Sequence, residues 1–381
     1  MRTRFDRWIF EGYPISLDGL ALYRILFAAF FLIFGVPKFG WVSQLPDFFY
    51  YPVAISIAPF FQGFPPAWFT QGSSLLLSLG FVLLLFGWRT RWVSLSIFVL
   101  VIVNRTFGFS LGKIDHDIML WLTLLCMAFS HWEGRYSLDA LDGRERPPQT
   151  WTVSLVALLL GFAMFSAGLP KLMGGWLDPG TQATRGYLFQ MFHGGGRQAL
   201  LAPWLIQIES AWFWEPLDWF AVWFELLFLP AVFFPRWFRF MVGVAVVFHV
   251  GNYVMLNIGF STNLIAYLLF VRWDWLLGWL RKRSWLARLN RFIHLRTLLI
   301  TAAAYLMYHA LLVWVVPAWL GQRLVVAIDE ALPFSYGLFL TGAMLAAGVV
   351  VILLHLRTLW RMRKLRLAAP HSPEGSPLSE S

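Results

Sequence analysis

Residues 151–170 read WTVSLVALLLGFAMFSAGLP, a run without a single acidic, basic or histidine side chain. A membrane-spanning helix needs about 20 mainly apolar residues, because the hydrocarbon core is about 30 Å thick. This stretch therefore predicts a transmembrane helix. Similar runs recur along the chain and predict about ten spans, at approximately 19–37, 69–88, 92–109, 116–131, 151–170, 217–234, 237–256, 258–273, 297–318 and 334–357.

The composition predicts an all-α fold, a polytopic transmembrane helical bundle. Hydrophobic residues make up 59% of the 381 residues and charged residues only 13%, against about 25% charged residues in soluble domains. A soluble protein of this length could not bury so much apolar surface. The single cysteine, Cys126, lies in an apolar run, so we expect no disulfide.

The basic residues predict the orientation. With the N-terminus inside, 23 of the 30 Lys and Arg residues fall on inner segments, which is the bias typical of cytoplasmic loops. We therefore expect both termini in the cytoplasm, in a bacterial inner membrane. The net charge of +10 reflects these loops, so the lipid bilayer is the expected partner and nucleic acid is not.

Three ionisable residues and one amide are predicted to lie at similar depth near the outer leaflet. His116 opens the fourth span, Lys171 closes the fifth, and His249 lies in the outer half of the seventh. Asn252 follows His249 by three residues and shares its helical face. Charged groups are costly at membrane depth and often mark functional sites. Two interpretations stay open: these residues form one shared site, or each is a separate side chain that snorkels or packs as an ordinary polar group.

Two other ionisable residues lie within predicted spans. Arg24, one turn into the first span and six residues after Asp18, is interpreted as an interfacial ion pair or a snorkelling side chain. Glu225, near the middle of the sixth span, is expected to be protonated or paired. A structural and a functional role are both compatible with its position.

Burial against apolar walls would favour a neutral amine at Lys171, which could then act as a base. Gly168 and Pro170 before it, and Gly174 and Gly175 after it, are expected to end the helix and admit a flat ligand. Such a pocket suits a lipophilic quinone. No metal site is expected, because no tight His, Cys or carboxylate spacing is present.

Four ordered motifs in residues 16–275 resemble the HTTM membrane proteins, the wider bacterial relatives of the vitamin K-dependent γ-glutamyl carboxylases. FSAGLPKLMGGWL resembles the lysine motif of the family, and IDHDIMLWLTLL with RYSLDAL resembles its histidine segment and its Ser-x-Asp ending. FHVGNYVMLNIGF resembles the Phe-His-x-x-Asn segment, and SLDGLALYRILFA resembles the first span. The matching residues are Asp18, Arg24, His116, Ser137, Asp139, Gly168, Lys171, Leu172, Trp176, Phe248, His249, Asn252, Ile258 and Gly259.

The resemblance implies an enzyme that uses vitamin K hydroquinone or a related quinol, with O2 and CO2 as co-substrates. Lys171 would be the initiating base and His116 would orient the reacting partner. His249, Asn252 and Trp176 would line the cofactor site. A peptide or protein on the non-cytoplasmic side would be the substrate, carboxylated at a glutamyl side chain.

The chain departs from the carboxylases after about residue 275. It is expected to hold a carboxylase-like transmembrane domain at 1–275, a basic cytoplasmic loop at 276–296, two additional spans at 297–357, and a basic, then disordered cytoplasmic tail at 358–381. We expect these segments to lack the large extramembrane portion that grips substrate in the carboxylases. Two alternatives therefore stay open: a non-catalytic HTTM protein acting in maturation of, or immunity to, a secreted peptide, and a transporter, which is disfavoured because no inverted repeat is visible.

Overall fold

A computed structural model describes residues 3–34, 36–111, 118–143 and 146–282, together with the short pieces 303–304, 306–307, 348–349 and 352–353. Those residues form helices and turns and include no β-strand, which confirms the prediction of an all-α fold. The predicted site residue His116, most of the two predicted spans 297–318 and 334–357, and the predicted tail lie outside the described residues.

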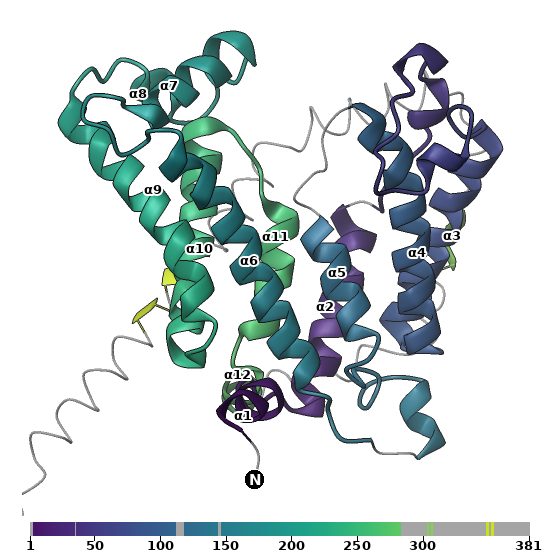
Figure 1. Ribbon diagram of the computed structural model, residues 1–381. Coiled ribbons are helices and arrows are strands. Elements are labelled where there is room, and N and C mark those ends of the chain that lie inside the picture. Colours follow the sequence, from purple (N-terminus) through teal and green to yellow (C-terminus); the bar gives the residue numbers. More distant parts are fainter. Residues whose placement is uncertain are drawn as a thin grey trace, which may run out of the picture.

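Within the described residues, eight helices lie roughly parallel to one another and alternate in direction along the chain (Figure 1). They form two neighbouring groups, with α2 to α5 in one and α6 with α9 to α11 in the other, and α5 packs against both α6 and α11 across the boundary. The helices are α2 (Leu17–Phe34), α3 (Ala67–Phe86), α4 (Thr90–Gly108), α5 (Ile118–Met127), α6 (Trp151–Met173), α9 (Ala211–Ala231), α10 (Pro235–Leu256) and α11 (Ser261–Tyr267).

Among the residues that the structure describes, four helical segments are long and apolar enough to cross a membrane. At about 1.5 Å per residue, a helix of 20 residues reaches the thickness of the hydrocarbon core, about 30 Å. The four segments are Ala67–Phe86, Thr90–Leu111, Trp151–Met173 and Pro235–Leu256. They agree with the second, third, fifth and seventh predicted spans to within three residues at each end, and the protein has the helices of a membrane protein.

The eighth predicted span, 258–273, is much shorter as a helix. α10 ends where Asn257 adopts a left-handed conformation with φ of 54°. The chain then continues without helix to Phe260, and α11 covers only Ser261–Tyr267 before a 3-10 turn at Leu268–Phe270. Seven helical residues cover about 10 Å, so the length of this apolar run overstated the length of the helix.

Short helices lie at both ends of the bundle. α7 (Ala183–Phe189), a π-helical turn (Gln190–Gly194) and α8 (Ala202–Leu205) lie at one end, beyond α6 and α9 (Figure 1). The sequence predicted turns in this segment, and Gly175, Gly180 and Gly196 do have positive φ angles, but the short helices were not predicted. At the opposite end lie α1 (Arg4–Glu11) and α12 (Trp273–Arg281), which extends into the predicted basic loop. The remaining 3-10 turns are Val42–Gln44, Asp47–Phe49, Ala58–Phe60, Phe109–Leu111 and Asp139–Asp142.

α6 and α9 form the most extensive helix pair in the described structure, and two glycines of α6 allow their close approach. A Cβ at Gly161 would lie 2.5 Å from a methyl carbon of Val232, and a Cβ at Gly168 would lie 2.9 Å from the Cβ of Glu225. The two glycines are seven residues apart, so they lie on one helical face. Gly168 therefore sets how closely α6 approaches Glu225.

Arg24 is fully buried and does not snorkel. Its Nη1 donates to the carbonyls of Leu84 at 2.6 Å and Leu85 at 2.8 Å, at the end of α3. Its Nη2 donates to the carbonyl of Tyr136 at 2.5 Å and lies 3.5 Å from that of Arg135. The guanidinium thus joins α2, α3 and the loop before α6, a role that differs from the predicted interfacial ion pair.

The Ser-x-Asp segment completes this junction. The Asp139 carboxylate caps α4, because it accepts the backbone N–H groups of Arg89 at 2.7 Å and Thr90 at 2.8 Å. The backbone N–H of Asp139 in turn donates to the carbonyl of Gly87 at 3.0 Å. This motif stabilises the turn between α3 and α4, at the end of the molecule opposite α7 and α8.

Candidate functional site

Lys171 lies in the last turn of α6, which continues through Gly168 and Pro170 and ends at Met173. The expectation that Gly168 and Pro170 help to end the helix was therefore wrong, whereas Gly174, also expected to end it, is the residue at which α6 stops. Proline removes one intrahelical hydrogen bond, but the turn is held because the carbonyls of Pro170 and Lys171 accept the N–H groups of Gly174 and Trp176. Lys171 is thus held on a regular helix, with its direction set by α6.

The amine of Lys171 forms an ion pair with Glu225 of α9, with 2.5 Å between Nζ and Oε1. The Lys171 side chain is 24% exposed and that of Glu225 only 5%. The other oxygen of Glu225, Oε2, is buried and has no hydrogen-bond partner among the described residues. A buried carboxylate oxygen without a donor is costly, so this oxygen marks a place where a ligand donor or water would be stabilised.

Trp176 lies against the same amine. Its ring centroid is 5.1 Å from the Nζ of Lys171, within the range of a cation–π contact. The backbone N–H of Trp176 donates to the carbonyl of Lys171 at 3.2 Å, which folds the residues after α6 back over the helix end. The sequence placed Trp176 at the site, and the structure places its ring beside the lysine.

His249 belongs to a second buried pair. Its Nε2 lies 3.0 Å from the hydroxyl oxygen of Tyr267 on α11, and the two rings are stacked with centroids 5.8 Å apart. The same hydroxyl lies 3.9 Å from the sulfur of Met164 on α6. The ring of Phe260 also packs against the imidazole, with 4.6 Å between the ring centroids. The rings of Tyr267 and Phe260 thus hold the histidine in one orientation, and Met164 contacts the tyrosine hydroxyl.

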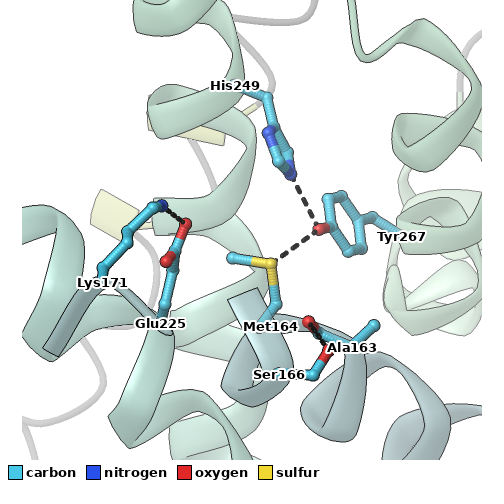
Figure 2. Close-up of polar contacts among 7 residues, drawn as sticks. All are labelled: Ala163, Met164, Ser166, Lys171, Glu225, His249 and Tyr267. Atoms are coloured by element: carbon cyan, nitrogen blue, oxygen red, sulfur yellow. Dashed lines mark hydrogen bonds and ion pairs between the residues drawn. The ribbon is translucent and has the colours of Figure 1, made fainter. Parts of the chain in front are cut away.

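The two pairs lie on opposite sides of Met164 in the same interhelical region (Figure 2). Phe224 and Phe248, the sequence neighbours of Glu225 and His249, have ring centroids 5.2 Å apart and connect the two helices. The structure therefore brings Lys171, Trp176 and His249 into one region. The carboxylate of Glu225 and the phenol of Tyr267 lie in the same region.

Asn252 lies one turn beyond His249 and is half-buried. Its backbone carbonyl accepts the N–H of Asn257 at the end of α10. The Asn257 side chain bonds both backbone groups of Ala199, at 2.8 Å and 2.9 Å. This end of α10 therefore anchors the segment that contains α7 and α8.

Two acidic residues on α9 were undervalued by the sequence analysis. Glu225 was noted without being assigned to the site, and Asp218 was overlooked. Asp218 is fully buried and accepts the backbone N–H groups of Ala183 at 2.8 Å and Thr184 at 2.7 Å, so it caps α7. The spacing of seven residues between the two acids was a signal, because it places both on one face of a helix. Tyr267 gave no such signal, since aromatic residues occur throughout the chain.

The chemistry available here is proton transfer among a lysine, a carboxylate, an imidazole and a phenol. Within the described part of the chain, no group of three His, Cys, Asp or Glu side chains could hold a metal ion. No protein-family model, curated protein or solved structure matches this chain.

Proposed function

We propose that this protein is a membrane enzyme that deprotonates a reduced quinone at the Lys171–Glu225 pair and thereby starts its oxygenation. The overall reaction balances as quinol plus O2 giving quinone epoxide plus water. One observation carries the proposal: Glu225 is buried, one of its oxygens contacts the Lys171 amine at 2.5 Å, and the other has no partner in the described structure.

The Lys171–Glu225 pair can act as a base more readily than an isolated lysine could. Across the short hydrogen bond the proton of the ion pair can move from Nζ to Oε1 of Glu225, which leaves a neutral amine that can take a proton from the quinol. The resulting ammonium is stabilised by its hydrogen bond to Oε1 and by the face of Trp176. Electrostatic interactions of this kind are stronger in a site with little water. The sequence predicted a neutral amine in a wholly apolar pocket. The structure instead has a lysine whose proton can move to a second acceptor, Oε1 of Glu225.

The residues around the pair fit a flat aromatic ligand with two oxygens. When bound, a quinol supplies an ionisable O–H group and a ring that reacts with O2. The free Oε2 of Glu225 would accept a hydrogen bond from one quinol oxygen. His249 and Tyr267 form a donor–acceptor pair that would orient another oxygen, and Phe248 and Phe260 provide apolar ring faces. Asn252 would contact the ligand from the same helix as His249.

We further propose that the protein is related to the HTTM membrane proteins. It would span a bacterial inner membrane ten times, with both termini in the cytoplasm. Four membrane-length helices and the alternating directions of eight helices support that topology. Carboxylation of a glutamyl side chain is a further step of the same proposal: the oxygenated quinol would remove the γ-proton, which leaves in the water formed with the epoxide, and the resulting carbanion would bond to CO2 as a carboxylate. It would need a peptide to reach the end of the molecule where α7 and α8 lie.

The test is oxygen-dependent turnover of vitamin K hydroquinone by purified protein in lipid nanodiscs, with the epoxide measured by chromatography. Lys171→Met keeps the length of the side chain and removes the base, so epoxide formation should fall by at least about 100-fold. Lys282→Met is the matched control, because Lys282 is exposed at the opposite end of the molecule beyond α12. Equal turnover by the Lys171 and Lys282 variants would contradict the catalytic assignment.

A Lys171→Met protein that keeps full function in cells, while no quinol is oxidised by the wild type, would favour the accessory role in maturation or immunity instead.

A further inference from the structure

The segment of residues 39–66 connects α2 to α3 at the end of the molecule that carries α7 and α8 (Figure 1). Asp47 is its only charged residue. The segment of residues 131–150, which lies between α5 and α6 at the opposite end, is shorter and contains seven charged residues. The two connecting segments therefore differ in chemistry, and only the second has the composition of a loop in water.

The large apolar side chains of the first segment are exposed. Phe48 is 79% exposed, Tyr51 82%, and both Ile55 and Phe60 are 87% exposed. Single exposed apolar side chains are common on protein surfaces, but an apolar patch that no charged residue interrupts usually marks an interaction site. No charged residue occurs between Phe48 and Phe60, so contact with water is an unfavourable environment for this stretch.

The segment has a small core of its own, which keeps these side chains at the surface. Val42 and Ala58 are buried against Phe107 of α4. The ring of Phe61 packs edge-on against that of Phe107, with 5.3 Å between the centroids. The hydroxyl of Tyr50 donates to the carbonyl of Ala58 at 2.5 Å. The exposed side chains thus belong to a folded segment that presents them in a fixed arrangement.

The polar side chains of residues 46–61 leave little for a protein partner to bind. The hydroxyl of Ser56 donates to the carbonyl of Val53 at 2.6 Å. Asp47 lies beside the backbone of Gly63, where an added Cβ would be 2.9 Å from its Oδ1. Protein–protein interfaces have a polar rim and about one hydrogen bond per 100–200 Å². An apolar surface with so few polar groups fits lipid better than another protein.

The position of the segment identifies the lipid bilayer as the partner. α3 follows it directly and is one of the four membrane-length segments, and Trp68 in the first turn of α3 is 68% exposed. On the other side the segment packs against Phe107, in the last turn of α4, a second membrane-length segment. It therefore lies where two spans end, which is the level at which membrane proteins concentrate aromatic side chains.

We propose that residues 46–61 form an interfacial anchor, which inserts Phe48, Tyr51, Ile55 and Phe60 into the lipid leaflet at this end of the molecule. Burial of these side chains among the lipids removes their apolar surface from water. The anchor fixes the depth of the helix group α2 to α5 in the bilayer. It belongs to the other helix group from Lys171 and does not depend on the quinol chemistry.

The experiment measures the depth of single spin labels in phosphatidylcholine nanodiscs by electron paramagnetic resonance, from collisions with lipid-soluble O2 and with a water-soluble nickel chelate. The free thiol of Cys126 is buried and is removed as Cys126→Ala. Labels are then attached to Phe48→Cys, Ile55→Cys and Phe60→Cys in separate preparations. Leu141→Cys is the matched control, because Leu141 is also 79% exposed but lies in the charged segment. We expect the three labels about 5–10 Å inside the leaflet, as for interfacial helices, and the control label in water.

Three labels as accessible to nickel as the label at Leu141 would place the segment in water and overturn the proposal. Labels shielded from both O2 and nickel would also overturn it and assign the surface to a second copy of the chain or to another protein. A second measurement uses the wild-type protein without any cysteine variant. A phospholipid with a photoreactive diazirine in its acyl chain should label residues 46–61 and leave residues 131–150 unlabelled, and absence of label from 46–61 would contradict the anchor.

Discussion

The two helix groups both bury a charged side chain, but they treat it differently. In the group of α2 to α5, Arg24 has both terminal nitrogens bonded to backbone carbonyls, and only Nε lacks a partner within the described residues. In the group of α6 and α9 to α11, Glu225 has one side-chain partner and an open oxygen. A buried charge bonded to main-chain groups stabilises a fold, whereas a buried carboxylate that has one oxygen without a partner and a titratable side chain at the other is available for proton transfer.

The largest expected effect comes from Arg24→Met. It leaves the carbonyls of Leu84, Leu85 and Tyr136 without their charged donor, and each such hydrogen bond contributes about 1.5–3 kcal/mol. We expect a loss of at least about 3 kcal/mol in the free energy of unfolding, measured by equilibrium denaturation in mixed micelles. Arg24→Lys keeps one charged nitrogen donor, so its free energy of unfolding should lie between those of the wild type and Arg24→Met. Quinol turnover per folded molecule should stay unchanged. A loss of turnover per folded molecule would contradict a purely structural role for Arg24.

Glu225→Gln should show the opposite pattern. The amide keeps the shape and an acceptor for Lys171 but cannot share a proton, so quinol turnover should fall by about 100-fold. The free energy of unfolding should change by less than about 1 kcal/mol, because the neutral amide is cheaper to bury than the carboxylate. Epoxide formation and denaturation of the same preparation measure both effects. Strong destabilisation with normal turnover of the folded fraction would make Glu225 a structural residue like Arg24.

The two glycines of α6 offer a matched pair of smaller changes. Gly161→Ala and Gly168→Ala each introduce a Cβ that must displace α9, and overpacking of this kind costs about 1–3 kcal/mol. Both variants should lower the melting temperature to a similar degree. Only Gly168→Ala, whose Cβ meets that of Glu225 at 2.9 Å, should also lower turnover. Equal turnover losses would show that helix spacing in general, rather than the position of Glu225, controls activity.

The smallest expected effect is a dependence of stability on alkaline pH. The Tyr13 hydroxyl, located between α1 and α2, donates to the carbonyl of Val232 at 2.6 Å, and burial raises the pKa of Tyr13 above its usual value, with Arg239 partly opposing the shift. A raised pKa means that the folded state favours the neutral phenol. This stability is complete below about pH 10, the value of an unfolded tyrosine, and is lost as the pH rises further. Tyr13→Phe should flatten the decline in melting temperature above about pH 10, and an unchanged slope would exclude this contribution.

The sequence predicted the helix positions well wherever an apolar run was long. α3, α4, α6 and α10 fall within a few residues of the predicted spans, because a membrane span depends mainly on length and hydrophobicity. α11 was predicted too long, since hydropathy cannot detect that Asn257 reverses the chain and leaves residues 258–260 outside any helix.

The candidate site was predicted only in outline. Lys171, Trp176 and His249 could be placed from depth and motif, but their partners Glu225 and Tyr267 depend on how α9 and α11 rotate about their axes. That rotation is set by close contacts such as the one at Gly168, which sequence periodicity does not resolve. The interpretation of Arg24 failed for a similar reason, because its acceptors are backbone carbonyls that no residue type reveals.

The segment over α6 and α9 is fastened at two points, by Asp218 at the start of α7 and by Asn257 at Ala199. Between these fasteners, Gly194, Gly195 and Gly196 are exposed, and exposed glycine-rich tips tolerate insertions best. A fluorophore or epitope placed there would be carried by a segment anchored on either side. The triplet is therefore a practical handle for reporting on which side of the membrane this end of the molecule resides.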